Sequence, residues 1–365
     1  MIEGSHLRRV LVSVSFAAAL GGTATSLLEH RSQAAGLAPD PIIDAHIHLY
    51  QVSRPGGVPW PKPQNKTLYR DMTPAEYKQQ AQQSGIIAAG VVEASPLFAD
   101  NARLLESIKN DSFFSFVVAQ LDVGAADFTQ KLDTLAQDPR VVGIRGFHWN
   151  QKMTLDAKQI EHLKDLAARG MTLDLVSGGG GNSPDLIGKL ADAVPDLRII
   201  VDHLGGAKGD TAEPTWLENM RKLAEHKNVY MKFSSLFDMF SPPGNEDEPW
   251  QTPRTVGAYK DNLDWLMGVF GSERLIFGSN WPVADLGGGL AAEIQLAETY
   301  FEPLGKKVRN KVMYQNAQQF YRRVLPSHEE VKVSKLTKKP ASKPERASDR
   351  RRDSNRRQNA RQLQH

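Results

Sequence analysis

Short apolar runs recur between residues 39 and 325, and each is followed by a segment with the residue spacing of an amphipathic helix. Apolar runs of four to eight residues predict strands, and longer segments with apolar positions three and four apart predict helices. The predicted strands are Ile42–His48, Ile87–Glu93, Phe114–Leu121, Val141–His148, Thr172–Val176, Arg198–His203, Val229–Ser234 and Arg274–Ser279. The predicted helices are Pro74–Gln83, Asn101–Asn110, Asp127–Gln137, Asp156–Arg169, Pro184–Ala193, Pro214–His226 and Gly257–Phe270, with two more near Ala291–Phe301 and Gly305–Leu325.

This alternation of strands and helices predicts an α/β fold built from parallel βαβ units. The 287 residues from 39 to 325 suit a single-domain (β/α)8 TIM barrel, which typically has ~250 residues. A doubly wound open sheet is the alternative. It is disfavoured because the first predicted strand lacks a glycine-rich phosphate-binding turn, and Gly178–Gly181 is better explained as a flexible loop beside the site.

The first 38 residues have the features of a targeting segment. Arg8 and Arg9 precede the apolar run Val10–Leu20, which is too short to span a bilayer comfortably. We therefore expect a secretory signal, an exported protein in the periplasm or medium, and no stable membrane insertion after processing. The paired arginines hint at twin-arginine export, and a frayed N-terminal helix is the alternative.

Composition separates a basic tail from a mildly acidic body. Residues 326–365 contain 12 Lys and Arg against 5 Asp and Glu and few large apolar residues, which predicts a disordered basic tail. The body from 39 to 325 carries a net charge of −5, so nucleic-acid binding is not expected. The chain has no cysteine, so any metal must be held by other ligands such as histidines and carboxylates.

Polar residues gather where the predicted strands end. Because the active sites of such barrels lie at the C-terminal ends of the strands, these residues are expected to meet at one rim. The first strand supplies His46 and His48, which are two apart and therefore project from the same face. The later strands supply Glu93, Arg145, His148, Trp149, His203, Lys232, Asn280 and Trp281.

These motifs carry a family resemblance. Asp-Ala-His-Ile-His at 44–48, Gly-Ile-Arg at 143–145, Asp-His-Leu-Gly at 202–205 and Gly-Ser-Asn-Trp-Pro at 278–282 resemble the amidohydrolase superfamily. The chain is most similar to its amidohydrolase-related (amidohydrolase 2) branch, from about Pro41 to Arg323. That branch contains lactonases, other hydrolases and decarboxylases, all on a TIM barrel.

The resemblance implies a metal site and shows departures from it. His46, His48 and His203 match metal-binding histidines of the superfamily. The fifth strand offers Asp174 and Ser177 but no histidine, and Asn280 stands where the superfamily has an aspartate. One divalent metal, zinc or manganese, and a metal-free site therefore both remain open.

The lactonase branch fits this residue set best, because some of its members work without metal. It implies that His46, His48 and His203 polarise the carbonyl of a lactone, and that Arg145 holds a carboxylate or hydroxyl of the substrate. Trp60, Trp149 and Trp281 are predicted to stack on the ring, and Lys232 to contact the substrate. Asn280 can orient water but cannot deprotonate it, so the general base is left among Glu93, His148 and Asp285.

The prediction is thus a hydrolase that opens the lactone of a small sugar acid or carboxylate, either as a monomer or as a homo-oligomer. A decarboxylase of the same superfamily is the enzymatic alternative. A non-catalytic exported binding protein on the same barrel is the second alternative, since Asn280 would mark a lost base.

Overall fold

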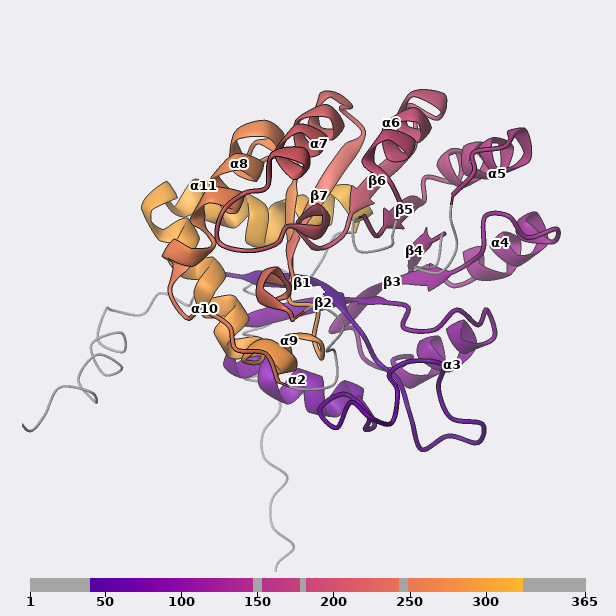
Figure 1. Ribbon diagram of the computed structural model, residues 1–365. Coiled ribbons are helices and arrows are strands. Elements are labelled where there is room, and N and C mark those ends of the chain that lie inside the picture. The colour runs from indigo at the N-terminus through magenta and orange to yellow at the C-terminus, as the bar shows by residue number, and fades with distance from the viewer. Residues whose placement is uncertain (1–39, 147–152, 178–181, 243–248, 324–365) are drawn as a thin grey trace, which may run out of the picture. The chain divides into compact units, whose positions relative to one another are not determined.

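The computed structural model describes residues 40–146, 153–177, 182–242 and 249–323. All of these except Asp40 belong to one compact unit that starts at Pro41. Eight strands form one sheet in chain order, every neighbouring pair is parallel, and the helices flank the sheet (Figure 1). The strands are β1 Ile42–Ile47, β2 Ile86–Val92, β3 Phe114–Gln120, β4 Val141–Arg145, β5 Thr172–Leu175, β6 Arg198–Val201, β7 Val229–Ser234 and β8 Leu275–Gly278.

The sheet closes on itself between the end of β1 and the segment after β8. Ile47 and Trp281 form a parallel bridge, the His48 amide donates to the Trp281 carbonyl at 2.8 Å, and the Asn280 amide donates to the His46 carbonyl at 2.8 Å. This closure excludes the doubly wound open sheet and confirms the predicted (β/α)8 barrel. It also places the residues after β8 directly beside the two histidines of β1.

The main helices follow the predicted pattern. Thr73 and Ser183 cap α2 and α6 by accepting backbone N–H groups, and Pro74 and Pro184 occupy the first turns. The helices are α2 Pro74–Gln83, α3 Asp100–Ser107, α4 Phe128–Ala136, α5 Ala157–Ala168, α6 Pro184–Ala193, α7 Pro214–Glu225, α8 Lys260–Phe270, α9 Ala284–Gly287, α10 Leu290–Phe301, α11 Lys306–Asn310 and α12 Asn316–Tyr321. Short 3-10 turns follow β6 (η1, His203–Gly206) and β7 (η2, Leu236–Phe240), with two more at η3 Val256–Ala258 and η4 Glu302–Leu304.

The last predicted helix differs from the structure. The single helix expected over Gly305–Leu325 is divided into α11 and α12 by one π-helical turn (η5, Lys311–Gln315), and α12 ends where Arg322 takes a left-handed conformation with φ of 51°. Apolar spacing does not distinguish a π turn from an α turn. The predicted helix is therefore present, with a π-helical turn inside it and its end at Tyr321 instead of Leu325.

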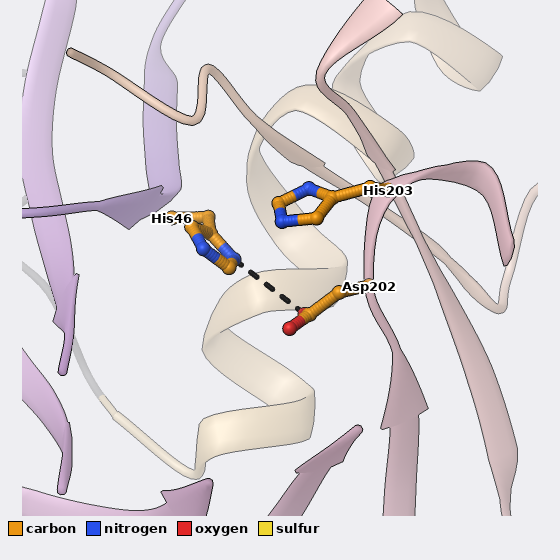
Figure 2. A group of neighbouring side chains, drawn as sticks. All are labelled: His46, Asp202 and His203. Atoms are coloured by element: carbon orange, nitrogen blue, oxygen red, sulfur yellow. Dashed lines mark ion pairs between the residues drawn. The ribbon is translucent and has the colours of Figure 1, made fainter. Parts of the chain in front are cut away.

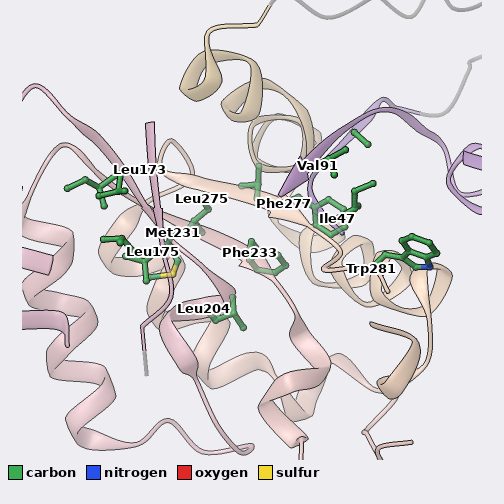
Figure 3. Close-up of a cluster of buried hydrophobic side chains, with 14 of the residues drawn as sticks. Ile47, Val91, Leu173, Leu175, Leu204, Met231, Phe233, Leu275, Phe277 and Trp281 are labelled. Carbon is green, nitrogen blue, oxygen red and sulfur yellow. The ribbon is translucent and has the colours of Figure 1, made fainter. Parts of the chain in front are cut away.

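Two apolar clusters hold the barrel together. The larger one lies between the strands and the surrounding helices and includes Ile47, Met231, Phe233 and Phe277, which Figure 3 labels. The smaller cluster consists of inward-facing strand residues closed off by α12, where Tyr321 stacks on Phe116 at a ring separation of 4.3 Å. Alternation along the strands assigns residues to the two clusters. One end of the barrel interior is therefore apolar, and polar chemistry is confined to the other.

Candidate active site

A cavity of about 330 Å³ opens at the C-terminal ends of the strands. Its polar wall includes His48, Glu93, Arg145, His203 and Asn280, which come from β1, β2, β4, β6 and β8 or the residues directly after them. Its apolar wall is formed mainly by Trp60, Leu68, Val176, Met239, Trp250, Val283 and Leu286. The rim predicted from the strand ends is therefore a cavity, and its lining offers both polar groups and hydrocarbon.

Asp44 organises the end of β1. Its carboxylate accepts hydrogen bonds from the His46 amide at 3.2 Å, the Ser279 amide at 2.8 Å and hydroxyl at 2.5 Å, and the Tyr77 hydroxyl at 2.8 Å. The side chain is completely buried. These bonds connect β1 to the segment after β8 and fix the backbone from which His46 projects.

In each of the three histidines, the Nδ1 atom of the ring contacts another group of the protein. His46 Nδ1 lies 2.8 Å from Lys232 Nζ, His48 Nδ1 lies 3.0 Å from the Val92 carbonyl, and His203 Nδ1 lies 3.0 Å from the Ser234 hydroxyl. The Nε2 atoms of His46 and His48 face each other at 3.2 Å. The rings of His46 and His203 are also neighbours, with centroids 4.6 Å apart.

A possible metal-binding group includes a carboxylate that the sequence analysis did not select. His46, Asp202 and His203 offer ligand atoms that lie within 4.8 Å of one another, and their side chains point toward a common centre (Figure 2). Two imidazoles and a carboxylate are compatible with a divalent metal. Asp202 directly precedes His203 in the chain, so its position beside a predicted ligand was the available signal.

Beneath the histidines lies a layer of buried charges, which we call the charged layer: Asp174, Asp202 and Lys232. Lys232 Nζ donates to Asp174 at 2.5 Å and forms an ion pair with Asp202 at 3.0 Å. Arg145 Nη2, at the edge of the cavity, donates to the other oxygen of Asp202 at 3.0 Å. All three residues of the layer have no exposed surface. Each charge is thus matched by an opposite charge, as burial requires.

Burial sets the protonation of the cavity wall. It lowers the pKa of His48 to about 4, with a further contribution from Arg145, and lowers the pKa of His203 to about 3. Burial also raises the pKa of Glu93 from its ordinary value of 4.5 to about 7, although Arg145 opposes this rise. The histidines are therefore neutral near pH 7, and Glu93 is the carboxyl whose charge changes there.

Three predicted site residues, His46, Trp281 and Lys232, have no exposed surface and do not line the cavity. For two of them the expected role also changes. Trp281 is completely buried against Tyr77, with ring centroids 5.2 Å apart, and does not line the cavity. Lys232 is completely buried in the charged layer and does not line the cavity either. The predicted stacking of Trp281 on a substrate and the predicted substrate contact of Lys232 are therefore corrected: both side chains point into the protein from strand ends.

The remaining predicted residues divide into three groups. Trp60 lines the cavity with its ring 5.9 Å from that of His48. His148 and Trp149 lie outside the described residues. Asp285 pairs with Arg70 at 3.4 Å and is not among the residues that line the cavity, so it does not meet the geometric requirement for the general base.

Asn280 is held at the cavity wall in an uncommon backbone conformation. The backbone φ of Asn280 is 56°, which is similar to the φ of 53° at His203. Its Nδ2 donates to the Ser235 hydroxyl at 2.7 Å. Its Oδ1 is buried and has no hydrogen-bond partner among the described residues. Positive φ at non-glycine residues is costly and is concentrated at functional sites. The structure thus presents an acceptor, but no base, at this position.

Other residues of the cavity were not found by sequence reasoning. Trp250, Lys208 and Asn65 line it from loops, and Asp238 and Met239 line it from the 3-10 turn η2. No motif marks these positions, since they come near the site only through the paths of the loops. Asn65 nevertheless shows a structural role, because its side chain accepts from the Leu68 amide at 2.8 Å.

The amidohydrolase family model matches residues 43–323, which cover the barrel from β1 to the end of α12. The chain belongs to the amidohydrolase family. An L-fucono-1,5-lactonase of Burkholderia ambifaria is 31% identical over 300 residues, covering 78% of this chain and 97% of the relative. An L-rhamnono-gamma-lactonase of Scheffersomyces stipitis is 28% identical over 41% of this chain and 47% of the relative.

Solved structures of the same family share the fold. An amidohydrolase of Burkholderia multivorans, crystallised with bound zinc, has a TM-score of 0.66 and 23% identity, covering 78% of this chain and 99% of that one. The family resemblance drawn from the motifs is confirmed. Among the described residues, no helix is long and apolar enough to cross a membrane.

Proposed function

We propose that this protein is a hydrolase that opens the lactone ring of a small sugar acid. The observation that carries the proposal is the 31% identity to a sugar-acid lactonase along nearly the whole length of that relative. The cavity supports it, because hydroxyl groups of a sugar ring suit the polar wall and its hydrocarbon face suits the apolar wall. The decarboxylase alternative rests only on the shared fold.

We also propose that the site holds one divalent metal, zinc or manganese, on the Nε2 atoms of His46, His48 and His203. The 3.2 Å separation of Nε2 in His46 and His48 is close to the ~3.3 Å expected between two nitrogens bound to one tetrahedral zinc at 2.0–2.1 Å. The Nδ1 side of His46 is less suitable, because Lys232 already lies there. When bound, the metal supplies a Lewis acid that polarises the lactone carbonyl.

Glu93 is the residue best placed to act as the general base. It lines the cavity, its Oε2 accepts from the Ser95 amide at 2.7 Å, and its other oxygen lies 3.8 Å from Arg145. Its raised pKa, about 7, matches the pH at which a base must be both deprotonated and able to take a proton. Arg145 supplies a positive charge beside the oxygen that becomes anionic.

The reaction balances with these groups alone. Glu93 takes a proton from water as the water oxygen bonds to the lactone carbonyl carbon. The bond from that carbon to the ring oxygen then breaks, and Glu93 returns the proton to the ring oxygen. The product is an open-chain hydroxy acid, which ionises and releases one proton to solvent. Asn280 lines the cavity, but its Oδ1 is buried and its amide cannot take up a proton, so it takes no part in these proton transfers.

The test measures turnover of a panel of five- and six-membered sugar-acid lactones, with and without added zinc or manganese. A pH indicator detects the acid that hydrolysis releases. We expect hydrolysis of at least one lactone above the spontaneous rate. Binding without turnover would favour the non-catalytic binding protein. Release of carbon dioxide from aromatic carboxylates, without lactone turnover, would favour the decarboxylase.

Export to the periplasm or medium is proposed separately. It is supported by the basic and apolar pattern of residues 1–38, which lie outside the described residues. Fractionation of cells that produce the full chain tests it, since retention of the unprocessed chain in the cytoplasm would contradict it.

A further inference from the structure

Lys232 contacts His46, a predicted metal ligand, at Nδ1, the ring nitrogen that is not proposed to bind the metal. Lys232 Nζ lies 2.8 Å from His46 Nδ1, and the pair is completely buried. The ammonium is held in this place from two other sides, by Asp174 at 2.5 Å and by Asp202 at 3.0 Å. A metal-binding histidine usually donates its second N–H to a carboxylate or carbonyl, whereas here the neighbour is itself a donor.

This contact determines where the proton of His46 lies. An ammonium has three donors and no acceptor, so His46 Nδ1 must accept from Lys232 and carry no proton. A neutral imidazole then has its proton on Nε2. That N–H faces Nε2 of His48 at 3.2 Å, which is free to accept because His48 Nδ1 donates to the Val92 carbonyl. The three contacts form one chain of hydrogen bonds in a single direction across the barrel.

A metal on Nε2 of His46 requires the opposite arrangement. The proton must move to Nδ1, where it would point at the Lys232 ammonium. Asp202 Oδ1 lies 3.5 Å from Nδ1 and is the acceptor that this proton would need. Lys232 and Asp202 therefore favour different tautomers of one imidazole: Lys232 the metal-free form, and Asp202 the metal-bound form.

We infer that Lys232 is a positioning residue that holds His46 in the Nε2-protonated tautomer, so that metal binding and the Lys232–His46 hydrogen bond exclude each other. The inference rests on the metal site of the proposed function. It means that the site binds its metal more weakly than three histidines alone would, and that the metal is readily exchanged. In the metal-free protein the same tautomer places the His46 Nε2–H as a donor to the Nε2 atom of His48.

The central experiment compares zinc affinity of the wild type with that of the double variant Lys232→Met and Asp174→Asn. This variant removes the ammonium together with one carboxylate, so the net charge of the charged layer is unchanged. Competition with a chromophoric chelator measures the affinity without any need for turnover. We expect zinc binding to be about tenfold tighter or more, the scale on which groups behind a ligand act.

A matched control is available on the surface. Lys78 pairs with Asp111 at 2.6 Å between α2 and the segment before β3, and both side chains are about one third exposed, without contact with any histidine in the described structure. The variant Lys78→Met and Asp111→Asn makes the same chemical change, and its zinc affinity should equal that of the wild type. Equal or weaker affinity in the Lys232 variant overturns the inference.

A second measurement does not depend on the Lys232 variant. Long-range nitrogen–proton NMR of the metal-free wild type reports the tautomer of each histidine, and loss of one signal set in His46→Gln assigns it. We expect His46 to be protonated on Nε2, and protonation on Nδ1 overturns the inference. Absence of zinc binding in both proteins would overturn the metal site and the inference together. Lactone turnover by the wild type is measured separately and would survive that result.

Discussion

The cavity wall and the charged layer below it are built from the same types of residue but differ in access. His48, Glu93 and Arg145 line the cavity, whereas Asp174 and Lys232 have no exposed surface. All five come from strands of the barrel or the residues directly after them. The difference shows that a strand end places a charged residue near the site, while its depth along the strand decides whether it can touch a substrate. In the proposed mechanism, residues of the cavity wall act directly on the substrate, and residues of the charged layer act by holding the wall residues in place.

The largest expected effect comes from removing a cavity histidine. His48→Ala should lower kcat/KM by about 10³-fold, because it removes a group at the carbonyl of the substrate. The fold should persist, since within the part of the chain that the structure describes the ring makes one hydrogen bond outside the histidine pair. Steady-state kinetics and a thermal melt of the same preparation check both statements. Unchanged turnover would remove β1 from the mechanism.

A substitution in the charged layer should mainly lower the free energy of unfolding. Lys232→Met leaves the carboxylates of Asp174 and Asp202 without their shared cation, which should lower the free energy of unfolding by about 3 kcal/mol or more. Urea denaturation measures this.

Two further variants sharpen this result. Adding Asp174→Asn should restore part of the loss, because it removes one uncompensated charge. Lys78→Met, in a partly exposed pair, should cost no more than about 1 kcal/mol. Equal losses for Lys78→Met and Lys232→Met would mean that the layer is not specially buried or paired.

These two regions also mark what the sequence could predict. Strand spacing and the motifs at strand ends were sufficient for the barrel and for His48, Glu93, Arg145 and His203 at one cavity. The predicted substrate contacts of Lys232 and Trp281 were wrong because of where the barrel places the two side chains. Strand alternation directs Lys232 into the barrel, and closure of the barrel buries Trp281. Lys232 shares its inward face with Tyr230 but lies deeper than the rim, and Trp281 packs against α2 through Tyr77. A local sequence pattern gives neither the depth of a side chain within the barrel nor the residues that it contacts across the barrel.

Loops limited the prediction for a different reason. Trp250 and Met239 reach the cavity from segments without a periodic pattern or motif, so no local signal indicated them. The tautomer of His46 depends on residues 186 positions apart. Contacts of this kind are determined by the packing of the whole barrel and not by neighbouring sequence.

Glu93→Gln should reduce kcat/KM by about 10²-fold and remove its pH dependence near neutrality. The wild-type rate should rise as pH passes about 7, where Glu93 loses its proton. The groups that face this carboxyl are Arg145, which lowers its pKa, and Asp202 and Asp100, which raise it. A pH profile of kcat/KM for both proteins checks the assignment. A wild-type rate that is flat from pH 5 to 9 would assign the base elsewhere.

Stability gives an independent test of the same carboxyl. Because its pKa is higher in the folded protein, the stabilisation from the protonated form is fully present below about pH 4.5 and is lost as pH rises through about 7. Gln cannot ionise. Relative to the wild type, Glu93→Gln should therefore be more stable at pH 8 than at pH 4.5, as urea denaturation at both values would show.

The smallest expected effect concerns the apolar wall. Trp250 is almost fully buried and its indole N–H has no hydrogen-bond partner among the described residues, while its backbone amide donates to the Leu286 carbonyl at 2.6 Å. Trp250→Phe keeps an aromatic surface and the backbone bond but removes the unpaired N–H. We expect KM to change by no more than about threefold and the free energy of unfolding to rise by up to about 1 kcal/mol, because a buried donor without a partner is costly. A KM increase of tenfold or more would mean that the indole N–H binds the substrate. The apolar wall would then act directly, as the polar wall does, and shape alone would not explain its role.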